Sequence, residues 1–483
     1  MTLPDETLAA RIAATLPGAR WFAGKGGTIG GVTIHERLPL PGPGGVALVL
    51  ADVQRPGGES DRYVLPVDAA GADAAAAPDC VTWLLDTMVS GSTAAGRVGR
   101  FAGHVVGAAP SRTGVLSPAV NASATPDGLV VAPIGGDASN TSLVATRGGR
   151  SWLVKLVRRC RPGLHPEVEV GAFFAEQSPW DDTPRLRGWL EHDGRVIATV
   201  HDFLPGCASA WDRLCGLLAD PQAGAALDRL VATLGRTTGR MHRALAARPD
   251  LPAFAAEAPS SAGRSTLAAR LAAHAEQVFA RIRSGTVPPP LADRLSSLMA
   301  ARPLIVGRLG QAATLAPESA DIRVHGDYHL GQVLVDATDR AFVIDFEGEP
   351  ARSLEERRAK TRAAKDVAGM CRSLDYALRH VARSTARPYR ADELARLEAI
   401  FLHAYESVAI GQPWWPGDRA EALALVEVFK LDKAIYELVY ELDNRPDWAA
   451  VPLAALQLVA LQLAAADPGS PKAARLTAGR SPG

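Results

Sequence analysis

Apolar and polar positions alternate with two different periods along the chain, and the change of period divides its 483 residues into parts. The first hundred residues mix an amphipathic helical stretch with short apolar runs between glycines and prolines. An alanine-rich linker at 69–78 separates these runs from a further helical pattern. The expected elements are a helix at 6–16, strands at 46–53 and 62–67, and a helix from Val81. We therefore expect a small α/β unit over residues 1–105.

Residues 106–203 form a β-rich pattern, with strands expected at 129–132, 141–146, 151–157 and 195–203 and a helix at 167–176. From residue 204 the pattern changes to long Ala/Leu/Arg-rich helices, which continue to residue 466 around one β-like island at 321–350. The tail, 467–483, is rich in Pro, Gly and Ser and is predicted to be disordered. The expected fold class is therefore α+β: a cap (1–105), a β-rich lobe (106–203) and a helical lobe (204–466).

Charge and composition exclude several classes of function. Lys plus Arg and Asp plus Glu both number 52, so the chain lacks the basic excess typical of nucleic-acid binding or of a polybasic membrane anchor. The five cysteines are scattered and form no CxxC pair, which argues against a disulfide framework or a zinc site. The apolar stretch 451–466 contains Gln457 and Gln462, so we expect an amphipathic or buried helix there. With no basic leader before an apolar run at the start, a cytoplasmic location is expected.

The β-like island carries the candidate chemistry. It reads HGDYHLGQVLV from His325 and, after a short turn, AFVIDFEG from Ala341. Phosphoryl transfer needs a carboxylate that orients the attacking hydroxyl and oxygen ligands that hold Mg²⁺. Asp327 and Gln332 stand five residues apart, and Asp345 ends the second β-like run. This is the order of base, amide ligand and carboxylate ligand in kinase catalytic loops.

A second interpretation of the same segment is a hydrolase metal site. His325, Asp327 and His329 alternate, and a strand would place all three on one face. Gly326 and Gly331 favour a loop instead, and no convincing partner ligands stand elsewhere in the sequence. A buried polar turn without chemistry is disfavoured because burying such groups is costly.

The motif H-G-D-x-H-x-x-Q, followed by an aspartate after the next strand, resembles the aminoglycoside phosphotransferase and choline kinase superfamily. Longer strings are similar to the maltokinases: RWFAGKG from Arg20, VIDFEGEPARSLEERR from Val343, KDVAGMCRSLDYA from Lys365 and DKAIYE from Asp432. The resemblance runs over nearly the whole chain. It implies a two-lobed, protein-kinase-like fold with an N-terminal cap, and it implies ATP and Mg²⁺ as cofactors.

The resemblance also implies roles for single residues. Asp327 would be the general base, Gln332 and Asp345 would hold Mg²⁺, and Lys155 would contact the nucleotide phosphates. Glu169 is preferred over Glu167 as the partner of that lysine. The phosphate-covering segment would be Gly135–Ser142, with Ser139, Asn140 and Thr141 as contacts, and the adenine hinge would be His201, Asp202 and Phe203. Asp366 is expected to bond the backbone of the catalytic loop.

The acceptor site is expected on the helix that follows Asp418. Its polar and aromatic residues recur every three or four positions and so share one face, although each of them could instead be core or surface. The predicted substrate contacts are His325, Glu347, Lys433, Tyr436, Glu437 and Tyr440. Glu349, Glu441 and Asn444 are further candidates. The pair Trp414-Trp415 could stack on a sugar, but we expect it to belong to the hydrophobic core.

The resemblance implies phosphorylation of maltose to maltose 1-phosphate, which feeds α-glucan synthesis, and a functional link to trehalose synthase. Two alternatives remain open. A glucosamine kinase of the same fold would have a metal loop closer to Asp-Phe-Asp-Gly-Asn-Pro, whereas this chain has Glu347 and Glu349. A catalytically silent pseudokinase is disfavoured because Asp327, Gln332 and Lys155 are intact.

Overall fold

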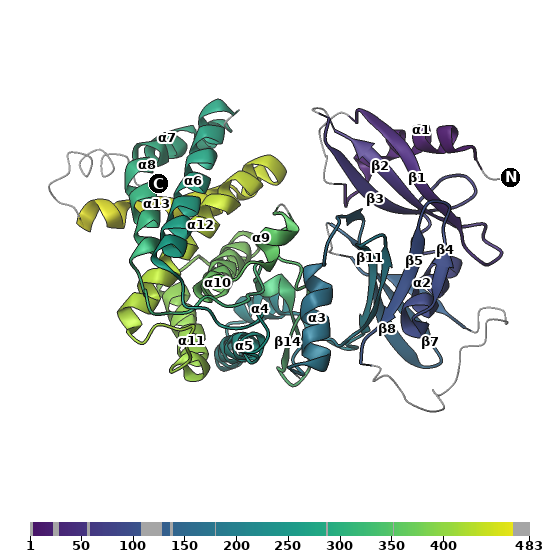
Figure 1. Ribbon diagram of the computed structural model, residues 1–483. Helices are drawn as coiled ribbons and strands as arrows, with labels where there is room; N and C mark the ends of the chain where they lie inside the picture. The colour runs from purple at the N-terminus through teal and green to yellow at the C-terminus, as the bar shows by residue number, and fades with distance from the viewer. Residues whose placement is uncertain are drawn as a thin grey trace. The chain divides into compact units, whose positions relative to one another are not determined.

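The computed structural model describes residues 3–22, 29–55, 58–107, 128–135, 139–178, 180–285, 288–350 and 352–466. The chain divides into two compact units (Figure 1). Unit 1 comprises Met1–Pro205 and Asp345–Arg358, and unit 2 comprises Gly206–Ile344 and Ala359–Gly483. The tail, most of the cap signature at 23–28 and part of the predicted glycine-rich segment at 136–138 lie outside the described residues.

The first sheet of unit 1 has four antiparallel strands in the order β1-β2-β3-β9. Their bounds are β1 Gly31–Pro39, β2 Ala47–Gln54, β3 Ser60–Val67 and β9 Arg159–Cys160. Helix α1 (Asp5–Thr15) lies against β1 and buries Leu8 and Ile12, one helical turn apart. The predicted strands at 46–53 and 62–67 are therefore present, whereas β1 lacks a continuous apolar run and was not expected.

The second sheet of unit 1 has seven strands in the order β4-β5-β10-β11-β8-β7-β6. Their bounds are β4 Thr93–Ala95, β5 Arg100–Val105, β6 Val130–Pro133, β7 Thr141–Arg147, β8 Arg150–Leu156, β10 Leu186–His192 and β11 Arg195–Asp202. Helix α2 (Pro78–Ser90) contacts β5 and β10, and α3 (Pro166–Glu176) contacts β10. One apolar core joins both sheets and α2, including Leu48, Leu84 and Leu190.

The two sheets exchange strands across the expected cap boundary. Strands β4 and β5 come before residue 105 but belong to the seven-stranded sheet, and β9 comes after it but joins the four-stranded sheet. The reason is that β5 pairs with β10 and β9 pairs with β3, and the local sequence pattern does not reveal these distant partners. The short helix α9 (Leu354–Arg358) also belongs to unit 1, although it was expected in the helical lobe.

Unit 2 consists of helices around one small sheet, β12-β13-β14. The strands are β12 Ala208–Ser209, β13 Val333–Val335 and β14 Ala341–Val343. The α-helices are α4 Ala210–Ala219, α5 Gly224–Leu245, α6 Ser261–Ser284, α7 Ala292–Ala300, α8 Arg302–Gly310, α10 Ala364–Ser384, α11 Ala391–Ala409, α12 Arg419–Asn444 and α13 Ala450–Ala466. Most residues of α10 are buried, and the helix packs against α12, α4 and α11.

Helix α10 supports the loop before β13 because it lacks a side chain at one point of contact. A Cβ on Gly369 would lie 2.4 Å from the carbonyl oxygen of Tyr328. Only glycine allows the helix backbone to approach this loop so closely. Trp414 and Trp415 are buried, and Trp415 packs on Tyr405 with ring centroids 4.7 Å apart, so both tryptophans belong to the core of this unit.

The segment Pro446–Ala465, which includes most of α13, is long and apolar enough by length and composition to cross a membrane, as core helices of water-soluble proteins also are. Part of it is packed inside the unit, including Val451, Leu453 and Leu456. The helix contacts α12, α7 and α8. Its apolar composition is therefore at least partly accounted for by packing against these helices.

Glu36 joins the two sheets of unit 1. It follows an irregularity in the β1–β2 register between Ile34 and Glu36, and its side chain is completely buried. The carboxylate accepts four backbone N–H bonds, from Arg37 at 2.7 Å, Arg97 at 2.8 Å, Val98 at 2.7 Å and Gly99 at 3.2 Å. Burial raises the pKa of Glu36, but these N–H groups outweigh burial and lower the pKa to about 2. The ionised carboxylate thus fixes the β4–β5 turn to β1.

We expect Glu36→Gln to lower the free energy of unfolding by about 3 kcal/mol at neutral pH, because the depressed pKa corresponds to that much preferential stability of the folded state. This contribution is present above the ordinary pKa of 4.5 and is lost as the pH falls towards about 2. The difference between wild type and variant should therefore shrink below pH 4.5. Urea unfolding as a function of pH measures it, with exposed Glu6→Gln as control; a constant difference contradicts the assignment.

Candidate active site

Lys155 is the centre of the candidate site in unit 1. It lies on β8, is 4% exposed and faces three carboxylates. Its Nζ lies 3.3 Å from Oε2 of Glu167 and 2.5 Å from Oδ1 of Asp345, and it also pairs with Oε1 of Glu347. One ammonium therefore faces three acids, so the group retains an excess of negative charge that favours a further cation.

Glu167, and not Glu169, pairs with Lys155, so the preference for Glu169 was wrong. The two residues are two positions apart on α3 and therefore point to different sides of the helix. Glu169 instead forms a bidentate pair with Arg358, at 2.8 and 2.9 Å. The pKa of Glu167 lies well below its usual range, because Lys155 and the adjacent His201 outweigh the effect of burial.

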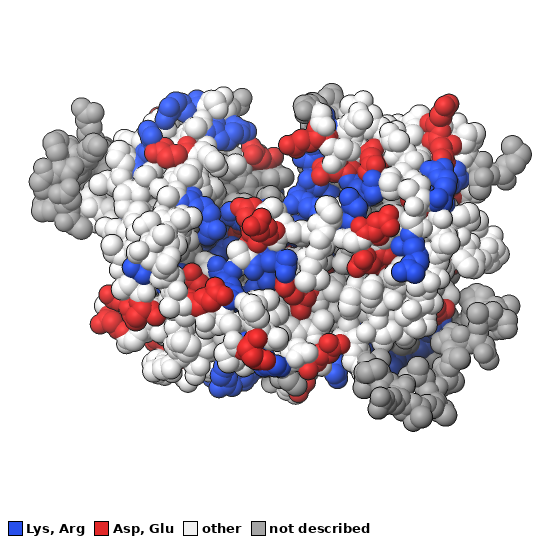
Figure 2. Space-filling model, in the orientation of Figure 1, with Lys and Arg blue, Asp and Glu red and all other residues white. Residues whose placement is uncertain are grey.

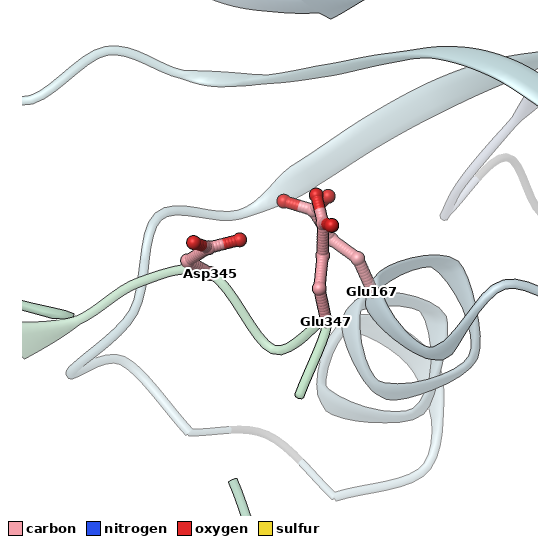
Figure 3. A group of neighbouring side chains, drawn as sticks. All are labelled: Glu167, Asp345 and Glu347. Carbon is pink, nitrogen blue, oxygen red and sulfur yellow. The ribbon is translucent and has the colours of Figure 1, made fainter. Parts of the chain in front are cut away.

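The carboxylate cluster fits a divalent cation. One ligand oxygen from each of Glu167, Asp345 and Glu347 lies within 4.8 Å of the others, and Figure 3 shows the three side chains converging. Carboxylate oxygens are the ligands that Mg²⁺ prefers. Asp345 has a φ of +66°, a conformation that non-glycine residues rarely adopt and that is often found at functional sites. Burial, Asp345 and Glu167 raise the pKa of Glu347, while Lys155 opposes them.

The predicted phosphate-covering segment is only partly described. Asn140 is buried and donates from Nδ2 to Oε1 of Glu347 at 2.7 Å, which ties this segment to the carboxylate cluster. The hydroxyl of Thr141 accepts a hydrogen bond from Nε of Arg158 at 2.8 Å. Ser139 is described and interacts with other residues. Nucleotide contacts by these three residues stay predictions.

The predicted hinge is already engaged in several interactions. His201 is buried, with Nε2 3.3 Å from Oε1 of Glu167, so its side chain supports the partner of Lys155. Asp202 forms a bidentate pair with Arg187 at 2.8 and 2.5 Å. The backbone N–H of Phe203 donates to Ser151 at 3.4 Å. An adenine contact at this hinge stays a prediction, and the side chains of His201 and Asp202 are already occupied.

The catalytic-loop motif lies in unit 2 and is held by Asp366. This buried carboxylate accepts the backbone N–H of His325 at 2.8 Å and of Gly326 at 2.9 Å. Gly326 has a φ of +87°, which explains why a glycine stands there. His242 of α5 lies 3.1 Å from the same carboxylate and is held in turn by Tyr405 at 2.9 Å. The predicted structural role of Asp366 is confirmed. The role of His242 was not predicted, because its Ala/Leu/Arg-rich surroundings contain no recognisable motif.

His325 holds the loop rather than presenting a group to a substrate, which corrects the predicted substrate contact. The residue is 2% exposed. Its Nε2 lies 2.9 Å from the carbonyl oxygen of Ile344, and its Nδ1 lies 3.4 Å from the backbone N of Asp327. His329 uses Nδ1 to accept from the N–H of Gly331 at 3.0 Å. Over the described ranges, the metal-like cluster involves none of His325, Asp327 and His329, so the hydrolase interpretation has no support.

Asp327 faces a cation from α12. Its Oδ1 lies 3.0 Å from Nζ of Lys433. Burial raises the pKa of Asp327, but the charges of Lys433 and His329 outweigh it, so the pKa lies well below the usual range. The carboxylate is therefore ionised throughout the neutral range. Gln332 lies in the same loop, and its carbonyl accepts the N–H of Ile344 at 2.9 Å, next to Asp345 in sequence. Metal binding by Gln332 stays a prediction.

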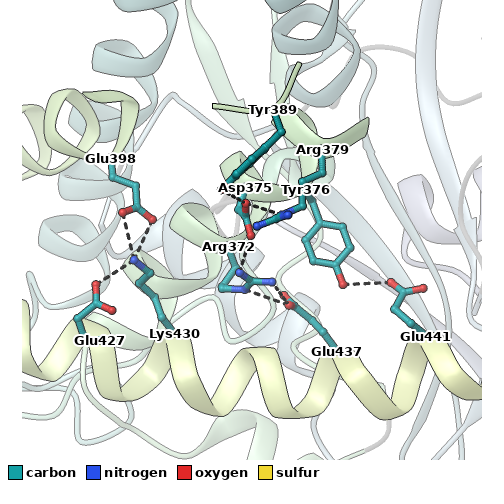
Figure 4. Close-up of polar contacts among 10 residues, drawn as sticks. All are labelled: Arg372, Asp375, Tyr376, Arg379, Tyr389, Glu398, Glu427, Lys430, Glu437 and Glu441. Atoms are coloured by element: carbon teal, nitrogen blue, oxygen red, sulfur yellow. Dashed lines mark hydrogen bonds and ion pairs between the residues drawn. The ribbon is translucent and has the colours of Figure 1, made fainter. Parts of the chain in front are cut away.

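The predicted face of α12 combines stacked tyrosines with paired acids. The rings of Tyr436 and Tyr440 stack at 6.2 Å, and Nζ of Lys433 lies 5.0 Å from the Tyr436 ring centroid. Glu437 accepts two bonds from Arg372, at 2.7 and 3.0 Å, within the network of Figure 4. Burial raises the pKa of Glu437, although Arg372 opposes it. Glu441 is bound by Arg445 and Tyr376. Arg372 and its network were not predicted.

The comparisons with known proteins decide the family. Residues 130–348 match the model of the Phosphotransferase enzyme family, and residues 16–98 match the Maltokinase N-terminal cap domain. A glucosamine kinase of Mycolicibacterium smegmatis is 30% identical over 348 residues, which are 67% of this chain and 78% of that protein. The chain belongs to the phosphotransferase enzyme family. The predicted superfamily and its phosphotransferase chemistry, with an alcohol group as acceptor, are thereby confirmed.

One further relative and one solved structure are also similar to this chain. A glucosamine kinase of Streptacidiphilus jiangxiensis is 29% identical over 313 residues, which span 62% of this chain and 66%, just under two thirds, of that protein. A solved structure of a glucosamine kinase in complex with glucosamine, ADP and inorganic phosphate is similar with a TM-score of 0.58 and 23% identity. The match covers 95% of this chain and 100% of that one, which confirms the predicted α+β fold.

We expect Lys433→Met to raise the pKa of Asp327, because burial remains while the opposing ammonium is removed. If Asp327 is the base, the acidic limb of the kcat/KM profile should move up by about one pH unit or more. The pH dependence of ADP release, with whichever sugar supports turnover, measures this shift. Lys360→Met, which removes a lysine paired with Glu257, is the control. An acidic limb that stays in place in Lys433→Met contradicts the coupling.

Proposed function

We propose that the chain transfers the γ-phosphoryl group of ATP to the anomeric hydroxyl of maltose and releases maltose 1-phosphate and ADP. The observation that carries this proposal is the ionised Asp327 carboxylate, held in its loop by Asp366 and facing Lys433 of α12. Such a carboxylate orients an attacking hydroxyl and accepts its proton. The relatives named glucosamine kinase support a sugar as the acceptor.

The nucleotide is assigned to the Lys155 site. Lys155 would contact the α- and β-phosphates, and Glu167 would hold its ammonium in place. ATP use is also supported by the ADP named in the solved glucosamine kinase complex. Because Lys155 is enclosed by carboxylates, nucleotide phosphates would meet an excess of negative charge there unless a cation accompanied them.

Mg²⁺ is that cation in our proposal, with Asp345 and Gln332 as ligands and Glu347 next to them. The donor set fits, since all are oxygen ligands and Glu167, Asp345 and Glu347 converge within 4.8 Å. When bound, Mg²⁺ would neutralise charge on the phosphates. Glu167 would hold the ammonium of Lys155 in place. Asp327 would align the attacking hydroxyl of the sugar and accept its proton on the carboxylate.

The charges on α12 favour a neutral sugar over an aminosugar. An ammonium on the substrate would need a carboxylate partner, but Glu437 and Glu441 are already paired with Arg372 and Arg445. Lys433, beside the base, would repel a second ammonium. The stacked rings of Tyr436 and Tyr440 offer the kind of surface on which the C–H faces of a sugar pack. Maltose is neutral and meets these conditions.

Glucosamine is the second candidate, favoured by the names of the two curated relatives. It shares the phosphoryl donor, the base and the cation site with the first. The two candidates differ only in the charge and size of the acceptor. A sugar panel therefore separates them without changing any other element of the proposal.

The test is a coupled ADP-release assay with Mg-ATP and, separately, maltose, glucosamine and glucose. We expect turnover with maltose, and about a 10²–10⁴-fold loss in Asp327→Asn, because an amide cannot accept the proton. Asp250→Asn is the control, since Asp250 is exposed and pairs only with Arg248 among the contacts described. Turnover with glucosamine alone would replace the acceptor and keep the base. Nucleotide binding without turnover on any sugar would favour a pseudokinase.

A further inference from the structure

Four arginines of unit 1 form a cluster beside the metal loop. We call Arg55, Arg159, Arg161 and Arg357 the arginine cluster. Arg55 and Arg159 share one carboxylate, Asp61, at 2.5 and 2.6 Å. On the face drawn in Figure 2, Lys and Arg side chains lie in several groups among Asp and Glu. The cluster carries more positive charge than Asp61 can neutralise.

Arg161 and Arg357 converge on one carbonyl oxygen, that of Arg352. Nη1 of Arg161 donates to the carbonyl oxygen of Arg352 at 2.8 Å, and Nε of Arg357 donates to the same oxygen at 3.2 Å. Nη1 of Arg357 donates to the carbonyl oxygen of Glu347 at 3.4 Å. Neither guanidinium has an ion pair with a carboxylate within the part of the chain that the structure describes. Each retains further N–H donors, since a guanidinium has five.

This convergence is electrostatically unfavourable. Burial, together with the charges of Arg159, Arg357 and Arg55, lowers the pKa of Arg161. Burial and Arg159 likewise lower the pKa of Arg357, although Glu347 and Asp345 oppose this. Two partly buried guanidinium groups that bond to one neutral oxygen repel each other. A bound anion would relieve this repulsion.

The surrounding chain fixes the two guanidiniums in place. Arg357 lies on α9, which is tied to α3 by the bidentate pair between Arg358 and Glu169. A Cβ on Gly163 would lie 3.6 Å from the side chain of Leu354, so the segment that carries Arg161 packs against α9. His165, in the same segment, has a buried Nδ1 with no hydrogen-bond partner among the residues described. Burial lowers the pKa of His165, and the charge of Arg357 lowers it further.

We propose that Arg161 and Arg357 form a binding site for a phosphate group, distinct from the Lys155 site. Guanidinium groups present paired N–H donors in a fork that matches the oxygens of a phosphate. The Lys155 site has an excess of negative charge from its carboxylates, whereas the site at Arg161 and Arg357 has an excess of positive charge from their guanidinium groups. The ligand class is free orthophosphate or a phosphate monoester. The site does not depend on the proposed acceptor or on turnover.

Calorimetric titration with sodium phosphate, at constant ionic strength, tests the site on the full chain. We expect binding by the wild type and about a tenfold or greater loss of affinity in both Arg161→Gln and Arg357→Gln, because each removes a charge-assisted fork. Arg294→Gln is the matched control, since Arg294 is a part-buried arginine of unit 2 that donates to Gln457. Lys155→Met should bind phosphate as the wild type does.

The variants also distinguish the alternatives. Absence of binding by the wild type, or loss of binding in Lys155→Met with both arginine variants unchanged, would overturn the proposal. If either glutamine variant fails to fold by circular dichroism, Arg161→Lys and Arg357→Lys keep the charge but remove the fork, and unchanged affinity in both would also overturn it. Titration with glucose 1-phosphate identifies the source of the bound phosphate group. Tighter binding than that of orthophosphate assigns a phosphate monoester, and equal binding assigns free phosphate. Both results lie within the proposed ligand class.

Discussion

The buried ammonium of Lys155 is the interaction on which the arrangement of unit 1 depends. An isolated charge in such a place would be very costly, so it must be surrounded by opposite charge. Its partners come from α3 and from the loop that begins at Asp345, and Asn140 adds a bond to Glu347. The pairing therefore brings a helix, a strand and a loop to one point. The excess of carboxylates over ammonium makes the same point suitable for Mg²⁺, without which nucleotide phosphates would be repelled there.

Unit 2 also contains a buried charge, and in this case it is negative. The buried carboxylate of Asp366 is compensated by two backbone N–H groups and by His242, and these bonds fix the loop that carries Asp327. Gly369 allows α10 to come close enough for this arrangement. Catalytic groups need this kind of rigid support, because a base that is not held in the reactive geometry loses most of its effect on the rate. The proposed base is thus positioned by groups that do not themselves touch a substrate.

The sequence was sufficient for the fold class and the family, because the motif around His325 fixes residue types and spacing, and for the structural role of Asp366, which opens the helix after the metal loop. It could not decide between Glu167 and Glu169, since the choice depends on how α3 is rotated about its axis. It assigned His325 to the substrate because the buried position of its ring follows from tertiary contacts to Ile344. The convergence of Arg161 and Arg357 was also invisible, because two residues far apart in sequence meet only after the chain folds.

Lys155 and its carboxylates form the proposed nucleotide site. Calorimetric binding of ADP in the presence of Mg²⁺ tests it most directly, with wild type, Lys155→Met and the control Lys360→Met compared after each is shown to be folded. We expect Lys155→Met to weaken ADP binding by about tenfold or more, because a charge-assisted contact to phosphate is lost, while the control binds as wild type does. Equal affinity of wild type and Lys155→Met for ADP would contradict the assignment of the nucleotide to Lys155.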